Sequence, residues 1–107
     1  MLLSLALSVL VAEARADGAA TYASLCSSCH GAAGAGDGVA GAGLPVKPAN
    51  FTDPAFWNAT RTDEYLKTVT TKGGAAVGKS PLMAPMGAGL SEAQLNELIA
   101  YLKTLKK

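Results

Sequence analysis

The sequence predicts an all-α fold of about four to five short helices in one domain. Apolar side chains repeat every three to four residues over 95–105, as on the buried face of a helix. Residues 62–74 carry ordinary helix start and stop signals, and no strand-like alternation interrupts the pattern. Six glycines among residues 31–43 exclude a regular element there, so glycine-rich loops are expected to connect the helices.

The first sixteen residues have the pattern of a secretory signal peptide. An apolar run over 2–12 precedes Ala14-Arg15-Ala16, which matches a small-x-small cleavage site, although no basic residue precedes the run. At about 1.5 Å per residue the run covers about half of a roughly 30 Å hydrocarbon core. We therefore expect export, cleavage after Ala16 and a periplasmic domain of residues 17–107 without a membrane span.

The charge balance and the length limit what this domain can do. Eight Lys or Arg stand against seven Asp or Glu in residues 17–107, and this even balance argues against a nucleic-acid-binding protein, which would show a basic patch or stripe. A domain this small buries only about 60–65% of its unfolded surface and needs additional stabilisation. We expect a monomer stabilised by a staple or a cofactor.

The start of the domain is expected to be a helix that packs closely against another helix. Residues 18–28 read as a helix in which Gly18, Tyr22 and Cys26 lie four apart on one face. A glycine on such a face indicates close approach of another helix, the alternative being a loop residue near the start of the domain.

Capping residues mark the starts of three further helical segments. Asp53 before Pro54 predicts a brief helical turn. Thr62-Asp63-Glu64 begins a longer helix that stops at Gly73-Gly74. Ser91 with Gln94 forms a capping box for the last helix.

Cys26-Ser27-Ser28-Cys29-His30 is the motif that carries chemistry, because C-x-x-C-H is the attachment signature of covalent c-type haem. Cysteines three apart share one side of a helical turn, so both can form thioethers with one porphyrin. The alternatives are a disulfide, a thioredoxin-type redox pair and half of a zinc site. Zinc lacks two ligands here, because the chain has no other cysteine and no second histidine.

The chain resembles the class I c-type cytochromes. The resemblance rests on Gly18 and Tyr22 before the motif, the glycine-rich loop after it, a loop with methionines and the final Ile99-Ala100-Tyr101-Leu102-Lys103. It implies the cytochrome c fold, with helices wrapped around one haem held by Cys26 and Cys29. It also implies that the first and last helices cross where Tyr22 meets the Leu98/Tyr101 face.

His30 is the expected ligand on one side of the iron, and methionines or lysines are the candidates for the other. The methionine loop, residues 80–87, offers Met83 and Met86, and a thioether ligand raises the reduction potential. The resemblance favours Met83, which stands seven residues before Leu90, although its usual Met-Pro order is here Met83-Ala84-Pro85. Met86 is the alternative ligand.

The resemblance further suggests partners for the haem and its histidine. A proline carbonyl should accept the Nδ1 hydrogen of His30, with Pro48 the first choice and Pro45 the second. Trp57 could donate its indole N–H to a haem propionate, the alternative being core packing.

A haem ligated on both sides leaves no site for a substrate, so the expected function is one-electron transfer to and from redox partner proteins and not catalysis. Lys47, Lys72 and Lys79 could form a weak docking rim. The alternatives are the electron-entry subunit of a larger oxidoreductase, or a five-coordinate haem sensor or peroxidase.

Overall fold

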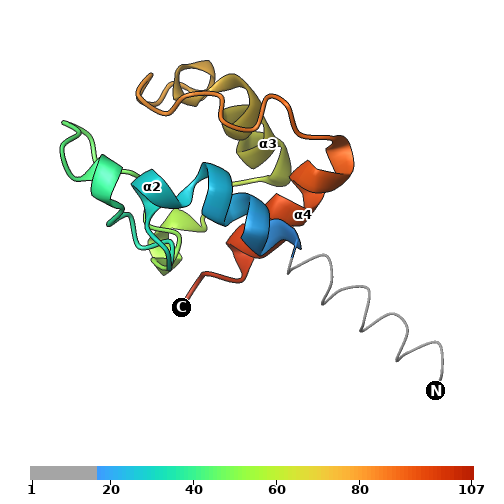
Figure 1. Cartoon of the computed structure of the whole chain (residues 1–107), viewed down its shortest axis with the longest axis horizontal. Coiled ribbons are helices and arrows are strands. Elements are labelled where there is room, and N and C mark those ends of the chain that lie inside the picture. Colours follow the sequence, from blue (N-terminus) through green and yellow to red (C-terminus); the bar gives the residue numbers. More distant parts are fainter. Residues whose placement is uncertain (1–16) are drawn as a thin grey trace.

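The computed structural model describes residues 17–107, so the predicted signal peptide lies outside the described residues. The described chain is all-helical, with no strand, as predicted (Figure 1). A helix over residues 17–25 comes first, and the elements after it are α2 (Ser27–His30), η1 (Val39–Gly41), η2 (Pro54–Phe56), α3 (Asp63–Lys72), η3 (Gly74–Val77) and α4 (Glu92–Lys103). Among residues 17–107, no helix has the length and apolar character needed to cross a membrane.

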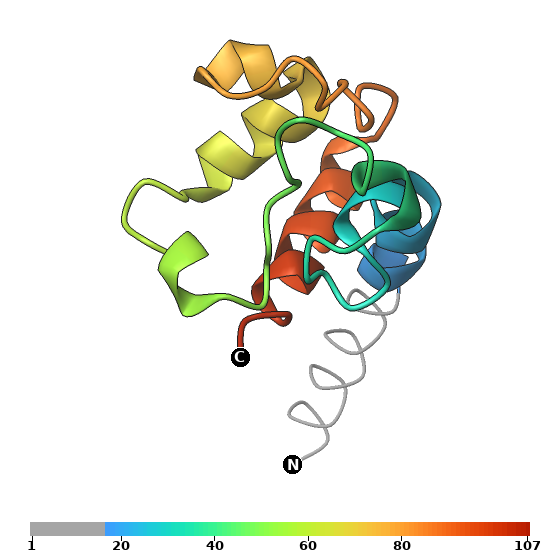
Figure 2. The same cartoon turned by 90° about the vertical axis from the view of Figure 1, so that its left-hand side faces the viewer.

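The N-terminal helix crosses α4 at Gly18, which confirms the predicted helix contact. A Cβ atom at this position would lie 2.9 Å from the Cβ of Tyr101 and closer still to the carbonyl oxygen of Glu97. One turn later the buried ring of Tyr22 packs against Tyr101, with 5.4 Å between ring centroids. In Figure 2, α4 lies between this helix and α3.

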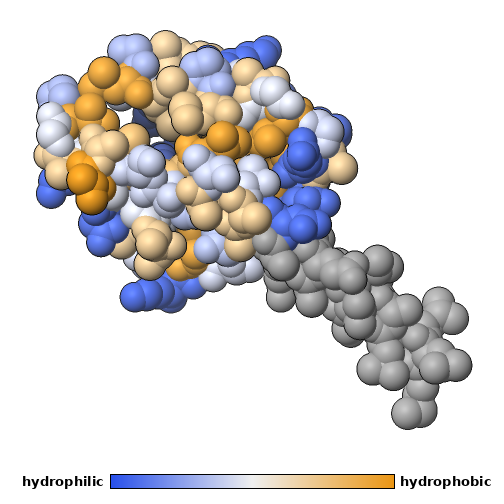
Figure 3. All heavy atoms as spheres, viewed as in Figure 1, coloured by the Kyte–Doolittle hydropathy of each residue, from blue (hydrophilic) through white to orange (hydrophobic). Residues whose placement is uncertain are grey.

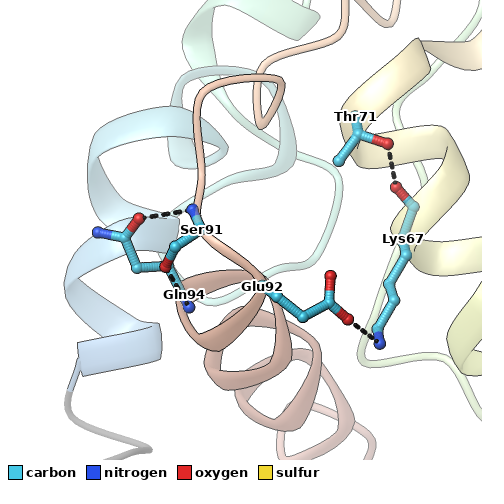
Figure 4. A network of polar contacts seen from close by, with 5 residues as sticks. All are labelled: Lys67, Thr71, Ser91, Glu92 and Gln94. Atoms are coloured by element: carbon cyan, nitrogen blue, oxygen red, sulfur yellow. Dashed lines mark hydrogen bonds and ion pairs between the residues drawn. The ribbon is translucent and has the colours of Figure 1, made fainter.

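The core forms where these helices meet. Its buried side chains come from the N-terminal helix, the loop before η2, α3 and α4: Tyr22, Phe51, Leu66, Leu95, Leu98, Ile99 and Leu102. Two exposed ion pairs join α3 to α4, Lys67 with Glu92 at 2.9 Å and Asp63 with Lys103 at 2.5 Å. Figure 4 shows the first pair beside the start of α4.

The two long helices begin where their capping residues predict. The Thr62 hydroxyl accepts the amide hydrogen of Tyr65, and α3 ends at Gly73. Ser91 and Gln94 form the reciprocal capping box of α4, also drawn in Figure 4. Asp53 caps Ala55 at the start of η2, which is a 3-10 turn.

Two details differ from the predicted elements. The N-terminal helix is interrupted by a turn at Cys26 before α2. The Ser27 hydroxyl donates to the Ala23 carbonyl at 2.7 Å, a bond back along the helix of the kind that bends helices. The chain also forms η3 directly after the glycine stop of α3, and no signal in the sequence predicted this extra turn.

Candidate functional site

A cavity of about 490 Å³ lies among the N-terminal helix, α3, α4 and the loops between them. Its walls are mostly apolar, and its volume is in the range of sites for small molecules and cofactors. Figure 3 shows a hollow in this face of the molecule, bordered by hydrophobic residues. Cys26, Cys29, His30 and Met83 all line this cavity.

The two cysteines lie at the junction of the N-terminal helix and α2. Both are free, half-buried thiols. Burial, and secondarily the neighbouring Cys29, raises the pKa of the Cys26 thiol to about 11. A thioredoxin-type thiol has a lowered pKa, so this environment disfavours the redox-pair alternative. Within residues 17–107, no group of three or more His, Cys, Asp or Glu side chains is placed to hold a metal ion.

His30 is fixed by a hydrogen bond and by a stacked ring. Its Nδ1 lies 3.1 Å from the carbonyl oxygen of Ala49, and its ring stacks on Phe51 with centroids 4.6 Å apart. A carbonyl can only accept, so Nδ1 carries the hydrogen and Nε2 is left free to bind a metal. Burial lowers the pKa of His30, partly opposed by the bond to Ala49, which keeps the imidazole in its neutral, ligating form.

The predicted proline acceptor is therefore wrong. The structure uses the carbonyl of Ala49 in place of that of Pro48 or Pro45. The Pro48 carbonyl instead faces Gly36, where a Cβ atom would lie 2.7 Å from its oxygen. Successive carbonyls of extended chain point in different directions, so a shift of one residue changes which one meets the imidazole.

Both methionines of the methionine loop line the cavity, but they differ in burial. Met83 is half-buried, whereas Met86 is 46% exposed. The loop is fastened to the end of α3 and the start of η3 by main-chain bonds. The Gly74 amide donates to the Met83 carbonyl at 2.8 Å, and the Gly87 amide donates to the Thr70 carbonyl at 2.9 Å. A Cβ at Gly74 would collide with the Ser80 carbonyl and lie 3.1 Å from the Cβ of Met83, so only glycine allows this approach.

Trp57 has a different partner from the one predicted. Its indole nitrogen donates to the Phe51 carbonyl at 2.8 Å, which uses the only N–H that the ring possesses. Trp57 packs against the core, as the alternative stated, and it does not line the cavity. This acceptor lies six residues earlier, in the preceding loop, and no signal in the sequence predicted it.

Sequence reasoning missed Arg61, the arginine in the cavity wall. Its guanidinium carbon lies 4.9 Å from the ring centre of Phe56 and 4.8 Å from that of Tyr65. Of the three lysines considered for docking, Lys47 and Lys79 line the cavity and are exposed, whereas Lys72 at the end of α3 does not line it.

These walls fit a covalently attached haem. Two thiols three residues apart and an imidazole with a free Nε2 lie in one apolar cavity, and a buried Nε of Arg61 there has no hydrogen-bond partner. Each part of haem c has a counterpart in this cavity. The apolar walls suit the porphyrin plate, the thiols its vinyl groups, the imidazole its iron, and the unpaired cationic donor its propionates.

Comparisons with known proteins agree with this site. The family of cytochrome c oxidase, cbb3-type, subunit III matches residues 13–102. A relative named cytochrome c-554(547), from Halothiobacillus neapolitanus, is 36% identical over 93 residues, which cover 85% of this chain and 96% of that protein. No solved structure matches the chain. The chain therefore belongs to the c-type cytochromes, which are electron-transfer proteins carrying covalent haem, and its helical fold is theirs.

Proposed function

We propose that this protein is an exported one-electron carrier with a single haem c, attached through Cys26 and Cys29 and ligated by His30 and Met83. The observation that carries the proposal is the convergence of these four side chains on one apolar cavity. When bound, the haem supplies an iron that alternates between the ferric and ferrous states. The chain's own residues hold that iron and determine which state is favoured.

His30 is the residue best prepared for its role. The bond to Ala49 selects the tautomer and fixes the ring plane, while Phe51 covers one face of the imidazole. Both contacts restrict the ring before any metal is bound. A preorganised ligand changes little between oxidation states, which favours rapid electron transfer.

Met83 is favoured over Met86 as the second ligand by its surroundings. Met83 is the less exposed of the two, and its own carbonyl is held by the Gly74 amide. A soft thioether ligand and an apolar cavity both disfavour the more highly charged ferric state. We therefore expect a relatively positive reduction potential and no open position for a substrate.

The partner surface that we propose surrounds the mouth of the cavity. Three of its lining side chains are strongly exposed apolar residues, Val46 at 57%, Leu82 at 51% and Met86 at 46%. Lys47 and Lys79 add two positive charges there. A small apolar patch with few charges suits brief encounters with redox partners, since such interfaces are small.

The second candidate function is an electron-entry subunit of a larger oxidoreductase. The matched family is described as an oxidase subunit, which favours this alternative. The near-complete coverage of the small c-554(547) relative favours a separate carrier. Purification distinguishes the two candidates. The soluble fraction is prepared first, without detergent, and the native membranes are then extracted with detergent. A separate carrier is recovered alone in the soluble fraction.

Optical spectra of the matured protein test the ligand assignment. The ferric wild type should show the weak long-wavelength band of an iron–sulfur bond. Met83→Ala should abolish this band and lower the reduction potential, whereas Met86→Ala, the matched control in the same loop, should retain it. Loss of the band in Met86→Ala alone would assign the sulfur ligand to Met86.

Mass spectrometry tests attachment and export together. The exported protein should begin at Asp17 and weigh one haem more than its amino acids. A colourless chain with the mass of the polypeptide alone would overturn the proposed function.

A further inference from the structure

We infer that three glycines, Gly36, Gly38 and Gly41, position the carbonyl that orients His30 and thereby help to set the reduction potential of the iron. We call these three residues the glycine clamp. This inference rests on the proposed function, because it requires an iron bound to His30. It assigns a role to residues that hold neither the haem nor the metal.

The glycine clamp has the spacing G-x-G-x-x-G, a pattern typical of dinucleotide-binding folds. In those folds the pattern follows a strand and opens a helix. Here it follows α2 and ends in the short turn η1, so its glycines serve another purpose. Each of them allows a close contact that a side chain would prevent.

One side of the glycine clamp lies on α2, which carries His30. The amide of Gly36 donates to the His30 carbonyl at 2.7 Å, and the amide of Gly38 donates to the Cys29 carbonyl at 3.1 Å. A Cβ atom would lie 2.6 Å from the Cys29 oxygen at Gly38 and 2.7 Å from it at Gly41. The loop is thus bonded to the same backbone that carries the imidazole.

The other side of the glycine clamp packs on Pro48 and Ala49. A Cβ atom at Gly36 would lie 2.7 Å from the Pro48 carbonyl oxygen and 3.3 Å from that of Ala49. A Cβ atom at Gly41 would lie 2.7 Å from Cγ of the Pro48 ring. Pro48 is therefore held at its carbonyl and at its ring, one residue before the carbonyl that accepts from His30.

The glycine clamp therefore determines how far the Ala49 carbonyl lies from α2. A side chain at Gly36 or Gly41 has to push Pro48 away, because the backbone of α2 closes the opposite side. The Ala49 carbonyl would move with Pro48 and lengthen its 3.1 Å bond to His30.

The expected effect on the iron follows from the basicity of the ligand. A hydrogen bond at Nδ1 makes His30 a more basic ligand, which stabilises the more highly charged ferric iron. A longer bond should therefore favour ferrous iron and raise the reduction potential. Simple loosening of the cavity has the opposite sign, because entering water stabilises the ferric state. The direction of the change in potential thus separates a positioning role from a merely structural one.

Spectroelectrochemical titration of the intact matured protein tests this direction. Gly41→Ala sets a methyl group against Pro48 without a positive φ, and it should shift the equilibrium about threefold to tenfold toward ferrous iron, about 30 to 60 mV for one electron. Gly43→Ala is the matched control, because a Cβ there meets nothing within 4 Å, and the potential should stay unchanged. Gly36→Ala, where φ is +80°, should shift the potential in the same direction as Gly41→Ala.

Proton nuclear magnetic resonance of the ferrous protein follows the hydrogen bond itself. In Gly41→Ala the Nδ1–H resonance of His30 should move to lower chemical shift, as expected for a weaker hydrogen bond, whereas in Gly43→Ala it should stay in place. A potential that falls in Gly41→Ala would overturn the inference. A resonance and a potential in Gly41→Ala that match those of Gly43→Ala would overturn it as well.

Hydrogen exchange in the ferrous wild type does not depend on a variant that folds. The Nδ1–H of His30 and the amides of Gly36 and Gly38 should be protected to similar degrees, because one opening of the glycine clamp exposes all three. Much weaker protection of the Nδ1–H than of both amides would show that the Ala49 carbonyl is held independently and would refute the inference. In that case an intact haem spectrum with its iron–sulfur band leaves the proposed function standing.

Discussion

The motif segment, Cys26 to His30, and the methionine loop, residues 80–87, are two walls of one cavity built in different ways. The motif segment consists of the turn at Cys26 and the short helix α2, and its imidazole is held by a hydrogen bond and a stacked ring. The methionine loop contains no helix, and main-chain bonds to Thr70 of α3 and Gly74 of η3 hold it in place. The histidine is thus held through its own side chain, by a backbone carbonyl and a stacked ring, whereas the methionine loop is held through its backbone, so we expect the methionine side to loosen first.

The largest effect is expected from removing both attachment points of the motif segment. The double variant Cys26→Ser/Cys29→Ser loses the covalent haem, and a domain this small has little other apolar material to replace it. It should be largely unfolded at room temperature by far-ultraviolet circular dichroism. Ser28→Ala, which changes an exposed residue of the same segment, should unfold like the wild type. A cooperative transition of the double variant at the wild-type temperature would contradict this prediction.

The methionine loop can be displaced through Gly74 without changing any ligand. Gly74→Ala places a methyl group against the Ser80 carbonyl and the Met83 side chain, which should cost about 1–3 kcal/mol of stability. The iron–sulfur band should weaken while the haem stays attached. Gly89→Ala is the matched control, since a Cβ there meets nothing within 4 Å. A full-strength band with unchanged stability in Gly74→Ala would show that the loop is not held at this contact.

The motif segment can be tested through Tyr22, whose hydroxyl donates to the Gly31 carbonyl at 2.6 Å, directly after His30. Burial raises the pKa of this phenol above its ordinary value of 10. Below pH 10, Tyr22→Phe should cost about 1 kcal/mol by leaving a buried carbonyl without its donor.

The same variant should change the response to alkaline pH. Above pH 10 the unfolded chain releases the phenol proton that the folded chain keeps, so wild-type stability should fall as the pH rises. Tyr22→Phe lacks this proton, and its denaturant midpoint should fall less steeply between pH 10 and 11. Parallel pH profiles for the two proteins would exclude Tyr22 as the source.

The smallest effect is expected at the ion pair between Lys67 and Glu92. Their side chains are 32% and 72% exposed, and exposed pairs contribute about 0–1 kcal/mol. Lys67→Met should lower the urea midpoint only slightly, and high salt should remove the difference. A loss similar to that of Gly74→Ala would mean that this pair helps α3 to hold the methionine loop.

The parts of the fold that the sequence predicted are those encoded by neighbouring residues. Thr62, Gly73 and Ser91 mark helix ends through bonds within one turn, and the structure has the ends there. Gly18 predicted a crossing because a glycine on a packing face has few other reasons to be there.

The errors concern groups whose partners are decided by tertiary placement. The Ala49 carbonyl replaces that of Pro48, and the indole of Trp57 turns to Phe51, because loop residues 31–51 position these carbonyls. Arg61 carries no local signal at all. Its place in the cavity wall, with Phe56 and Tyr65 as neighbours and an unpaired nitrogen, becomes visible only in the structure.

The contact between Gly18 and α4 also has a consequence for the timing of assembly. A chain is synthesised from its first residue, so the helix over residues 17–25 is made before Glu97 and Tyr101 exist to pack against it. The core can therefore close only when synthesis has reached α4. A product truncated before α4 would carry both cysteines beside an uncovered helix, open to wrong pairing and to proteases.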